Sequence, residues 1–394
     1  MNETIVRIAA RGDGVTASGR HIQFAVPGDL LLDDGTIRQG PGHQVPPCRH
    51  FPECGGCQLQ HLTDAAYSDY CISRVEGALA QHGLETEIRA PHLSPPRTRR
   101  RATLRALTAG GRVLIGFNQA GSNKIVDMME CHILHPRLFA LLAPLRRLLP
   151  SILLPKRTAE VQLALADQGP DVLLKGVTVS GLEAVEALTA FSEGQSLARL
   201  AIDEGFGSEP RFEPQPVTVT LGGVPVALPV GAFLQATEDG EAALVAAVRE
   251  AIAGAERIAD LFAGLGTFAF SLEGHVTAAE ASRDAVLAIK TVTGRAGKTI
   301  QAEHRDLYRR PLDSKELTAF DAVVLDPPRA GAVEQVRELA NSAAPRIAYV
   351  SCNPATFARD AEILASGGYR LRWVRPVGQF RWSTHVELAA AFSR

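Results

Sequence analysis

Apolar runs alternate with stretches of helical period in the part of the chain that follows residue 232. A helix is predicted over Glu238–Ala253. Five short apolar runs follow it, with helical stretches between them: Ile258–Phe262, Val276–Glu280, Ile300–Glu303, Ala322–Asp326 and Ile347–Cys352. This alternation predicts an α/β fold with a parallel, doubly wound sheet and right-handed crossovers. Two further strands, Leu371–Val377 and Val386–Phe392, have no helix between them, which predicts an antiparallel hairpin at the sheet edge.

The pattern before residue 233 favours β structure. Residues Ile5–Leu32 show short strands and turns typical of a small β-barrel fragment. A helix is predicted over Thr63–His82, with Thr63 or Asp64 as its cap and Gly83 as its stop. From about Arg99 to Leu228 the sequence alternates and predicts a mainly antiparallel middle domain with one amphipathic helix near Pro136–Leu149. We therefore expect three domains, at 1–46, 47–232 and 233–394.

Composition and charge exclude several classes of protein. The 394 residues are 46% hydrophobic and 21% charged, as in a packed globular chain, and the net charge of −2 lacks the excess of a nonspecific nucleic-acid coat. The most apolar stretch, Leu138–Leu154, is interrupted by Arg146 and Arg147, so no membrane span is expected. The charged beginning of the chain does not resemble a signal peptide. We expect a cytoplasmic protein that acts as a monomer.

A glycine-rich turn follows the first predicted strand of the α/β region. Ala263–Ala269 contains Gly264 and Gly266 where the strand ends and a helix is expected to begin, an arrangement that lets a ligand approach the backbone. Glycine turns of this kind are often only structural. Glu280, however, ends the next strand 20 residues after Asp260, where a carboxylate accepts hydrogen bonds from ribose hydroxyls. Together these features predict a nucleoside-type cofactor.

Two later strand ends carry further polar groups. Asp326-Pro327-Pro328-Arg329 and Ser351-Cys352-Asn353-Pro354 each follow a buried run, so both should lie at the carboxyl edge of the sheet. Read separately, Asp-Pro-Pro could simply end a strand, and Cys352 could be a small buried apolar residue. Their order after the glycine turn favours a methyltransferase over a dehydrogenase.

The ordered motifs resemble those of the S-adenosylmethionine-dependent RNA uracil-5 methyltransferases. They are Phe233-Leu234-Gln235, Asp260-Leu261-Phe262-Ala263-Gly264-Leu265-Gly266, Asp326-Pro327-Pro328-Arg329, Ser351-Cys352-Asn353-Pro354 and His385-Val386-Glu387. The resemblance implies a class I methyltransferase domain at the C-terminus and a shortened TRAM-like segment at the N-terminus. It also implies S-adenosylmethionine contacts from Gln235, Phe262, Gly264, Thr267, Glu280, Asp306 and Asp326. Family members commonly have Asn at the positions of Thr267, Asp306 and Thr237.

Methylation of uracil at C5 needs a nucleophile and a base. C5 is a poor nucleophile until a thiolate adds at C6, and Cys352 matches the family position for that thiolate. A helix beginning after Cys352 would favour the thiolate through its dipole. The C5 proton must then leave, and Glu387 matches the position of the general base. Its apolar neighbours would raise the pKa of Glu387, which suits a base.

Three closely spaced cysteines, Cys48, Cys54 and Cys57, suggest a metal site. On the family pattern Cys131 completes a four-thiolate set, which in the ribosomal-RNA branch holds a [4Fe–4S] cluster. Zinc is the competing interpretation, because four thiolates suit zinc as well. Cys71 lies outside the pattern and is expected to be a packed thiol on its helix.

An arginine-rich run is the best candidate for phosphate contacts, with five arginines between Arg97 and Arg105. The function expected is formation of 5-methyluridine in RNA, with 23S ribosomal RNA as the partner, because the transfer-RNA branch usually lacks the cysteine cluster. Two alternatives remain: another nucleic-acid methyltransferase, acting on cytosine C5, on an amino group or on transfer-RNA uracil, and a non-catalytic iron–sulfur RNA-binding protein.

Overall fold

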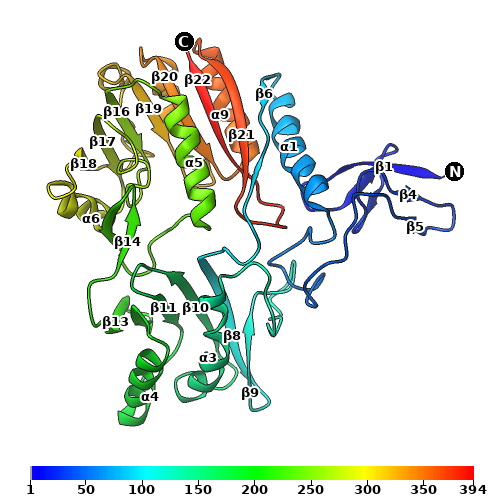
Figure 1. Ribbon diagram of the computed structural model, residues 1–394, viewed down its shortest axis with the longest axis vertical. Coiled ribbons are helices and arrows are strands. Elements are labelled where there is room, and N and C mark those ends of the chain that lie inside the picture. The colour runs from blue at the N-terminus through cyan, green and yellow to red at the C-terminus, as the bar shows by residue number, and fades with distance from the viewer. Residues whose placement is uncertain (1) are drawn as a thin grey trace. The chain divides into compact units, whose positions relative to one another are not determined.

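The computed structural model describes residues 2–394, which fold into two compact units (Figure 1). The first unit contains the chain up to Tyr70, Pro95–Val217 and the short segment Phe380–Thr384. The second contains Cys71–Ser94, Thr218–Gln379 and His385–Arg394. Each unit is therefore assembled from segments that are far apart in the sequence.

A small antiparallel sheet begins the first unit, with the strand order β3-β2-β1-β4-β5. Its strands are β1 (Glu3–Ile8), β2 (Gly14–Thr16), β3 (His21–Ile22), β4 (Leu30–Leu31) and β5 (Ile37–Arg38). Strand β1 pairs with both β2 and β4, and its Ile5 and Ile8 are buried. The short strands expected here are present, whereas the likeness to a TRAM domain stays a prediction.

The middle of the first unit is a six-stranded sheet with the order β13-β12-β11-β10-β8-β9. Its strands are β8 (Arg101–Ala109), β9 (Arg112–Gly116), β10 (Thr158–Leu165), β11 (Pro170–Lys175), β12 (Arg199–Asp203) and β13 (Ser208–Phe212). The pairings are antiparallel, as predicted, except that β11 and β12 run parallel. A parallel pair needs a crossover, and helix α4 (Gly181–Gly194) supplies it. Helix α4 was not predicted from the sequence, although its buried residues Ala184, Leu188 and Phe191 follow helical spacing.

The prediction of one continuous amphipathic helix near 136–149 is wrong, because the helix is broken into shorter pieces. The structure has α2 (Pro136–Phe139), α3 (Leu142–Leu148) and the short 3₁₀ turn η1 (Leu149–Ser151). Pro144 explains the break, because it has no N–H for the carbonyl of Ala140 and its ring crowds that carbonyl. Leu138 and Leu145 still bury the expected apolar face.

Helix α1 (Asp64–Ala80) follows the cysteine-rich segment; its predicted start is confirmed, and it ends two residues before the predicted His82. The hydroxyl of Thr63 accepts a hydrogen bond from the N–H of residue 66, and Gly83 takes the left-handed conformation with φ of +65°. Within the first unit, the hydroxyls of Tyr67 and Tyr70 donate to main-chain carbonyls of Phe380–Thr384 and hold that segment.

The second unit is built on a mixed sheet with the order β18-β17-β16-β19-β20-β22-β21-β6. Its five parallel strands confirm the prediction: β16 (Arg257–Leu261), β17 (His275–Glu280), β18 (Thr299–His304), β19 (Ala322–Leu325) and β20 (Arg346–Ser351). Its helices are α5 (Glu238–Ala251), α6 (Arg283–Thr293), α7 (Ser314–Leu317), α8 (Val333–Ala340) and α9 (Pro354–Ser366), and α5 crosses the sheet face turned to the viewer in Figure 1. The strand order reverses between β16 and β19, the point at which open α/β sheets bind ligands.

The C-terminal hairpin of β21 (Arg370–Gly378) and β22 (Glu387–Ser393) is antiparallel, as predicted, but it does not form the sheet edge. Strand β22 lies between β20 and β21, and β6 (Glu87–Ile88) and β7 (His92–Leu93) pair in parallel with β21. Strands of two residues carry no alternation, so the sequence gives no signal for this pairing. A separate hairpin, β14 (Thr218–Leu221) with β15 (Val224–Ala227), also belongs to the second unit.

The helix expected directly after the glycine turn is absent, since residues 264–271 form successive turns instead. The N–H of Ala269 donates to the carboxylate of Asp260 at 2.9 Å, which takes it out of an i→i−4 ladder. Gly266 has φ of +89°, and a Cβ there would lie 2.9 Å from the ring of Phe270. The turn is therefore fixed by glycine and Asp260 instead of by the first turn of a helix.

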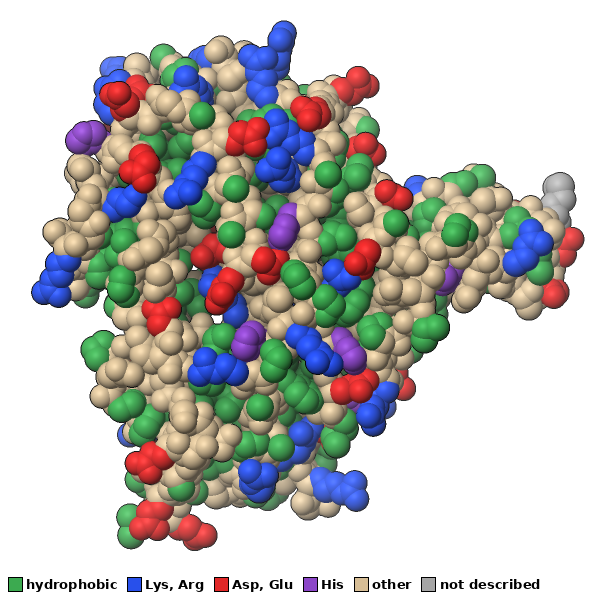
Figure 2. All heavy atoms as spheres, viewed as in Figure 1, with side chains coloured by type: hydrophobic (Ala, Val, Ile, Leu, Met, Phe, Trp, Pro, Cys, Tyr) green, Lys and Arg blue, Asp and Glu red, His purple; other side chains and the backbone are tan. Residues whose placement is uncertain are grey.

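The surface charges and the helices agree with two expectations from the sequence, a mixed surface and no membrane span. Figure 2 shows Lys and Arg side chains interspersed with Asp and Glu over the visible face, as the net charge of −2 suggests. Among residues 2–394, no helix has the length and apolar character needed to cross a bilayer.

Candidate functional site

The carboxyl ends of the parallel strands in the second unit surround a cavity of about 730 Å³. All nine site residues predicted in this unit line it: Gln235, Phe262, Gly264, Thr267, Glu280, Asp306, Asp326, Cys352 and Glu387. The volume lies within the range of ~300–1,000 Å³ typical of small-molecule sites. The structure thus brings these residues together, and their individual roles stay predictions.

Glu280 ties the glycine turn to the end of β17. Its Oε2 accepts a hydrogen bond from the N–H of Gly264 at 2.9 Å, and its Oε1 accepts one from Ser282 at 2.7 Å. The N–H of Ala263 donates to the carbonyl of Ala279 at 3.1 Å. A carboxylate oxygen has two lone pairs, so both oxygens of Glu280 retain acceptor capacity for ligand hydroxyls. The main chain therefore orients Glu280 before a ligand arrives.

Two aromatic rings form part of the cavity wall. The ring centroids of Phe262 and Tyr308 are 5.5 Å apart at an interplanar angle of 57°. The hydroxyl of Tyr308 donates to the carbonyl of Gly331 at 3.0 Å, and its N–H donates to Asp306 Oδ1 at 3.0 Å. Sequence reasoning missed Tyr308, for which the available signal was its position two residues after Asp306.

Asp260 and Asp326 are carboxyl groups that interact electrostatically, and Asp326 lines the cavity. Asp260 is fully buried, and its Oδ1 has no hydrogen-bond partner. Burial and the charge of Asp326 raise the pKa of Asp260 to about 7, and burial raises the pKa of Asp326 to about 7. Because neighbouring carboxylates resist ionising together, we expect the pair to keep a proton near neutral pH.

Cys352 lies between the end of β20 and Asn353, the N-cap of α9. The helix expected after Cys352 is present, but the groups around the thiol oppose the thiolate on balance. Burial raises the pKa of the Cys352 thiol, the charges of Glu387 and Asp326 raise it further, and Arg329 opposes them. Burial and two carboxylates thus outweigh one guanidinium and the helix end.

Glu387 is the first residue of β22, and its side chain is buried. Gln379 Nε2 donates a hydrogen bond to Glu387 Oε2 and another to Gln235 Oε1, the latter at 2.8 Å. Gln235 Nε2 in turn donates to Asp326 Oδ2 at 3.4 Å. These contacts connect the predicted base with residues predicted to contact the cofactor. Gln379 itself was missed because no motif included it.

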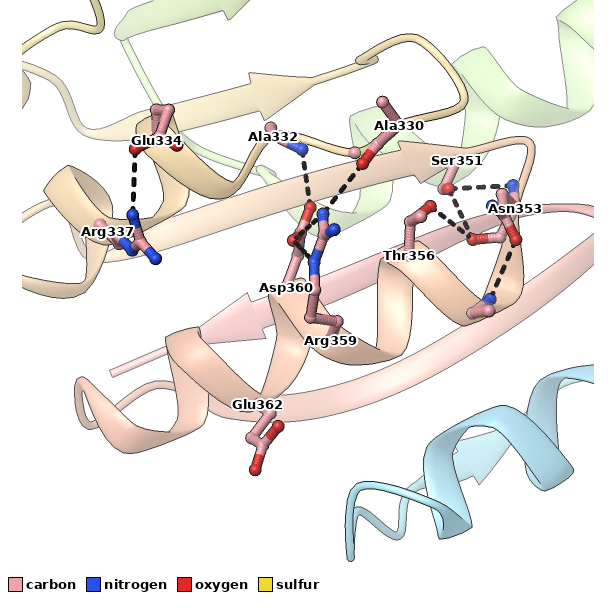
Figure 3. Close-up of polar contacts among 12 residues, drawn as sticks. Ala330, Ala332, Glu334, Arg337, Ser351, Asn353, Thr356, Arg359, Asp360 and Glu362 are labelled. Carbon is pink, nitrogen blue, oxygen red and sulfur yellow. Dashed lines mark hydrogen bonds and ion pairs between the residues drawn. The ribbon is translucent and has the colours of Figure 1, made fainter. Parts of the chain in front are cut away.

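Helix α9 anchors the loop that follows Asp326-Pro327-Pro328-Arg329 (Figure 3). The carboxylate of Asp360 is fully buried and accepts a hydrogen bond from the N–H of Ala332 at 2.7 Å. Arg359 pairs with Asp360 at 2.7 Å and donates to the carbonyl of Ala330 at 2.9 Å. The main chain of the loop is therefore held from both sides of Gly331.

The first turn of α9 holds the same loop one residue earlier. Asn353 Nδ2 and the hydroxyl of Thr356 both donate to the carbonyl of Arg329, at 3.3 Å and 3.2 Å. These hydrogen bonds use only the main-chain carbonyl of Arg329, so its guanidinium takes no part in them. Arg329 lines the cavity and is exposed.

The four cysteines predicted as metal ligands line a second cavity, in the first unit, with a water-accessible volume of about 20 Å³. Burial raises the pKa of Cys48, Cys54, Cys57 and Cys131, to about 12 for Cys57. The charges of neighbouring cysteines add to the rise at Cys48, Cys54 and Cys57, and the charge of Glu130 adds to it at Cys131. Cys71 is buried in α1 outside this cavity, as predicted. Within residues 2–394, no three His, Cys, Asp or Glu side chains are grouped so as to hold a metal ion.

The arginine run at 97–105 does not form the single phosphate patch expected from the sequence. Arg100 is buried, and Arg105 forms an ion pair with Glu160 at 3.0 Å. Arg99 is half-buried, and its charge opposes the rise in the pKa of Cys131. Successive side chains of an extended segment point to opposite faces, which divides the run.

Comparison with known proteins agrees with the geometry, which defines an α/β protein of the methyltransferase class. A family model described as tRNA (Uracil-5-)-methyltransferase matches residues 259–394. An uncharacterized RNA methyltransferase from Zymomonas mobilis is 50% identical over 393 residues, covering 99% of each chain. A 23S rRNA (uracil(1939)-C(5))-methyltransferase from Chromohalobacter salexigens is 33% identical, covering 91% of this chain and 78% of that protein.

A solved structure shows the same fold. The Pyrococcus abyssi tRNA (uracil-54, C5)-methyltransferase, in complex with S-adenosyl-L-homocysteine, matches with a TM-score of 0.77 and 23% identity, covering 100% of this chain and 99% of that one. The chain belongs to the RNA uracil-5 methyltransferase family. It is an S-adenosylmethionine-dependent RNA methyltransferase.

Proposed function

We propose that this enzyme methylates C5 of a uridine in 23S ribosomal RNA through a covalent adduct between Cys352 and C6 of the base. The observation that carries the proposal is that Cys352 and Glu387 line the same cavity as the predicted cofactor contacts. A nucleophile, a base and a methyl donor must all reach one pyrimidine ring, and a shared cavity satisfies that requirement.

The reaction proceeds in three steps. The thiolate of Cys352 bonds to C6, and the electrons of the C5–C6 double bond move into the ring to give an enolate. C5 then attacks the methyl carbon of S-adenosylmethionine, whose bond to sulfur breaks to release S-adenosylhomocysteine. Glu387 takes the C5 proton, the C5–C6 double bond re-forms, and the bond between Cys352 and C6 breaks. The thiolate is regenerated, and Glu387 releases its proton to solvent, so the enzyme can turn over.

The cofactor is bound by the side of the cavity around the glycine turn. Glu280 accepts hydrogen bonds from the ribose hydroxyls, because its two oxygens are already aimed by Gly264 and Ser282. The rings of Phe262 and Tyr308, which contact each other, form an apolar wall for the adenine. Gln235, Thr267, Asp306 and Asp326 supply the remaining contacts, and Gly264 allows the close approach of the backbone.

The four cysteines of the first unit hold a [4Fe–4S] cluster. Thiols at Cys48, Cys54, Cys57 and Cys131 share one cavity, and mutual repulsion of their thiolates calls for a cationic centre. A four-iron cluster takes one thiolate per iron, so its ligands surround a group of atoms instead of one ion. The cluster is structural or docks RNA, because methyl transfer needs no redox centre.

Ribosomal RNA is favoured as substrate by the relative that is named a 23S rRNA methyltransferase. The segment 47–232 serves RNA binding and cluster binding, and 233–394 performs the chemistry. Transfer RNA is the second candidate, because the solved structure with the same fold acts on transfer RNA. Mapping of 5-methyluridine in both RNA classes, in cells with and without the gene, separates the two.

RNA carrying 5-fluorouridine tests the adduct. Fluorine cannot leave C5 as a proton does, so the protein and RNA should stay covalently joined after methyl transfer, and a gel-stable species should form. Cys352→Ala should abolish this species while the binding of S-adenosylmethionine persists. An adduct that survives the substitution would assign the nucleophile to another residue.

A further inference from the structure

Gln379 lies between the predicted base and the cofactor side of the cavity, although it follows the end of β21 and belongs to no motif. We propose that Gln379 is the positioning residue of Glu387. Its amide N–H groups hold the Glu387 carboxylate as a hydrogen-bond acceptor and connect it to Gln235. This inference rests on the proposed role of Glu387 as general base.

Main-chain donors fix the orientation of the Gln379 amide. Its Oε1 accepts hydrogen bonds from the N–H of Ala236 at 2.8 Å and of Thr237 at 3.3 Å. A flipped amide would set its own NH₂ group against these two N–H groups, leaving buried donors without acceptors. The NH₂ group must therefore point toward Gln235 and Glu387.

Packing holds the side chain in this place. Gln379 is 1% exposed, and it passes the first turn of α5 at Gly240. A Cβ on Gly240 would lie 2.7 Å from Gln379 Cβ, so the side chains of most other residues would displace it. The start of α5 is itself fixed, because the hydroxyl of Thr237 caps it by accepting the N–H of Gly240 at 3.0 Å.

The two protons of the Gln379 NH₂ group have two separate acceptors. One is Gln235 Oε1 at 2.8 Å, and the other is Glu387 Oε2. An amide N–H donates and cannot accept, so this contact favours the ionised form of Glu387, the form that a general base needs. It also orients Glu387 against Gln235, which contacts Asp326 on the cofactor side.

Gln379→Glu removes the NH₂ group that donates to Glu387 and keeps the oxygen that accepts from the main chain. One oxygen of the new carboxyl group can still accept the N–H groups of Ala236 and Thr237, but the other meets the oxygens of Gln235 and Glu387. The two carboxyl groups would share a proton, which raises the pKa of the base. We expect the acidic limb of the pH profile for turnover to move up by about one pH unit, so turnover should be roughly tenfold slower at pH values below the limb and parent-like on the plateau above it.

Gln301→Glu is the matched control, because it places the same charge on an exposed position of β18 in the same unit. It should retain the parent pH profile. Thermal unfolding of the Gln379 variant shows whether it folds, and Gln379→Met provides a neutral variant that also lacks the donor and should shift the same limb upward.

The outcomes separate this inference from the proposed function. If Glu387→Gln stalls after methyl transfer while both Gln379 variants slow turnover by the same factor at every pH, Gln379 is only structural and the inference is overturned. Gln379 variants with parent-like turnover would also overturn it. If Glu387→Gln turns over normally, the assignment of the base fails first, and the inference falls with it.

Discussion

The two cavities of this protein differ in how their polar groups are satisfied. In the larger one, main-chain N–H groups donate hydrogen bonds to Glu280 at 2.7 Å and 2.9 Å. Gln235 donates to Asp326 at 3.4 Å, and Gln379 donates to both Gln235 and Glu387. These hydrogen bonds orient the side chains of Glu280, Gln235 and Glu387. In the cysteine cavity, burial raises the pKa of all four thiols, and nearby negative charges raise it further. Under the proposed function, the large cavity receives and releases substrates, whereas the four thiols of the small one hold a permanent cluster.

This difference predicts opposite responses to substitution. Removing one group from the large cavity should impair binding or one chemical step and leave the fold intact, because the other hydrogen bonds remain. Removing one thiol should release the whole bound group, because metal centres bind through all their ligands together.

The largest effect is expected for Cys131→Ser in the cysteine cavity. Protein purified without oxygen should contain about four irons per chain, and the variant should lose nearly all of them, since serine is a poor ligand for a cluster. Iron and sulfide analysis with the visible spectrum measures this. Cys71→Ser is the matched control and should keep its iron. Stoichiometric zinc in the parent protein would refute the cluster.

Glu280→Gln tests the larger cavity and should have a smaller effect. The amide keeps the shape of the side chain but loses charge and one acceptor atom, so the affinity for S-adenosylmethionine should fall by about 1.5–3 kcal/mol, roughly 10–100-fold. Isothermal titration calorimetry provides the affinity. Glu303→Gln, at a partly exposed position on β18, is the control. Equal affinity in the Glu280 variant would move the ribose site elsewhere.

Asp260→Asn should have the smallest effect, on stability and its pH dependence. Folding raises the pKa of Asp260 from 3.8 to about 7, so the folded state binds a proton that the unfolded chain releases. Its contribution to stability is therefore present at low pH and is lost as the pH rises to about 7. The parent should lose about 1–3 kcal/mol more stability than the variant between pH 5 and 8. Denaturant unfolding at both pH values checks this, and parallel curves would contradict it.

The sequence predicted the parallel core and the residues of the larger cavity because both are encoded locally. Each parallel strand is an apolar run with a polar residue at its end, as in Ala322–Asp326, and parallel strands bring such ends to one edge. The parts that were missed depend on contacts across the chain. The role of Gln379 can be recognised only in the folded chain, where Ala236 and Glu387 lie beside it. The raised pKa of Cys352 likewise depends on two carboxylates that the fold brings near the thiol.

A side-chain contact also explains one error in the predicted fold. The N–H of Ala269 is captured by Asp260, nine residues earlier, which replaces the helix expected after the glycine turn. The missed helix α4 is a different case, because its apolar spacing was present in the sequence and was obscured by the strands around it.

The central claim is that Cys352 and Glu387 act in succession on one uridine, and Glu387→Gln tests it most directly. The variant keeps the shape of the side chain but cannot take the C5 proton, so Cys352 should still attack and C5 should still be methylated. With unmodified uridine RNA and methyl-labelled S-adenosylmethionine, the account predicts a labelled, denaturant-stable protein–RNA complex and almost no multiple turnover. Glu334→Gln, at an exposed position on α8, should turn over as the parent does. Normal turnover in the Glu387 variant, or binding of both substrates without an adduct, would contradict the account and make His385 the next candidate for the base.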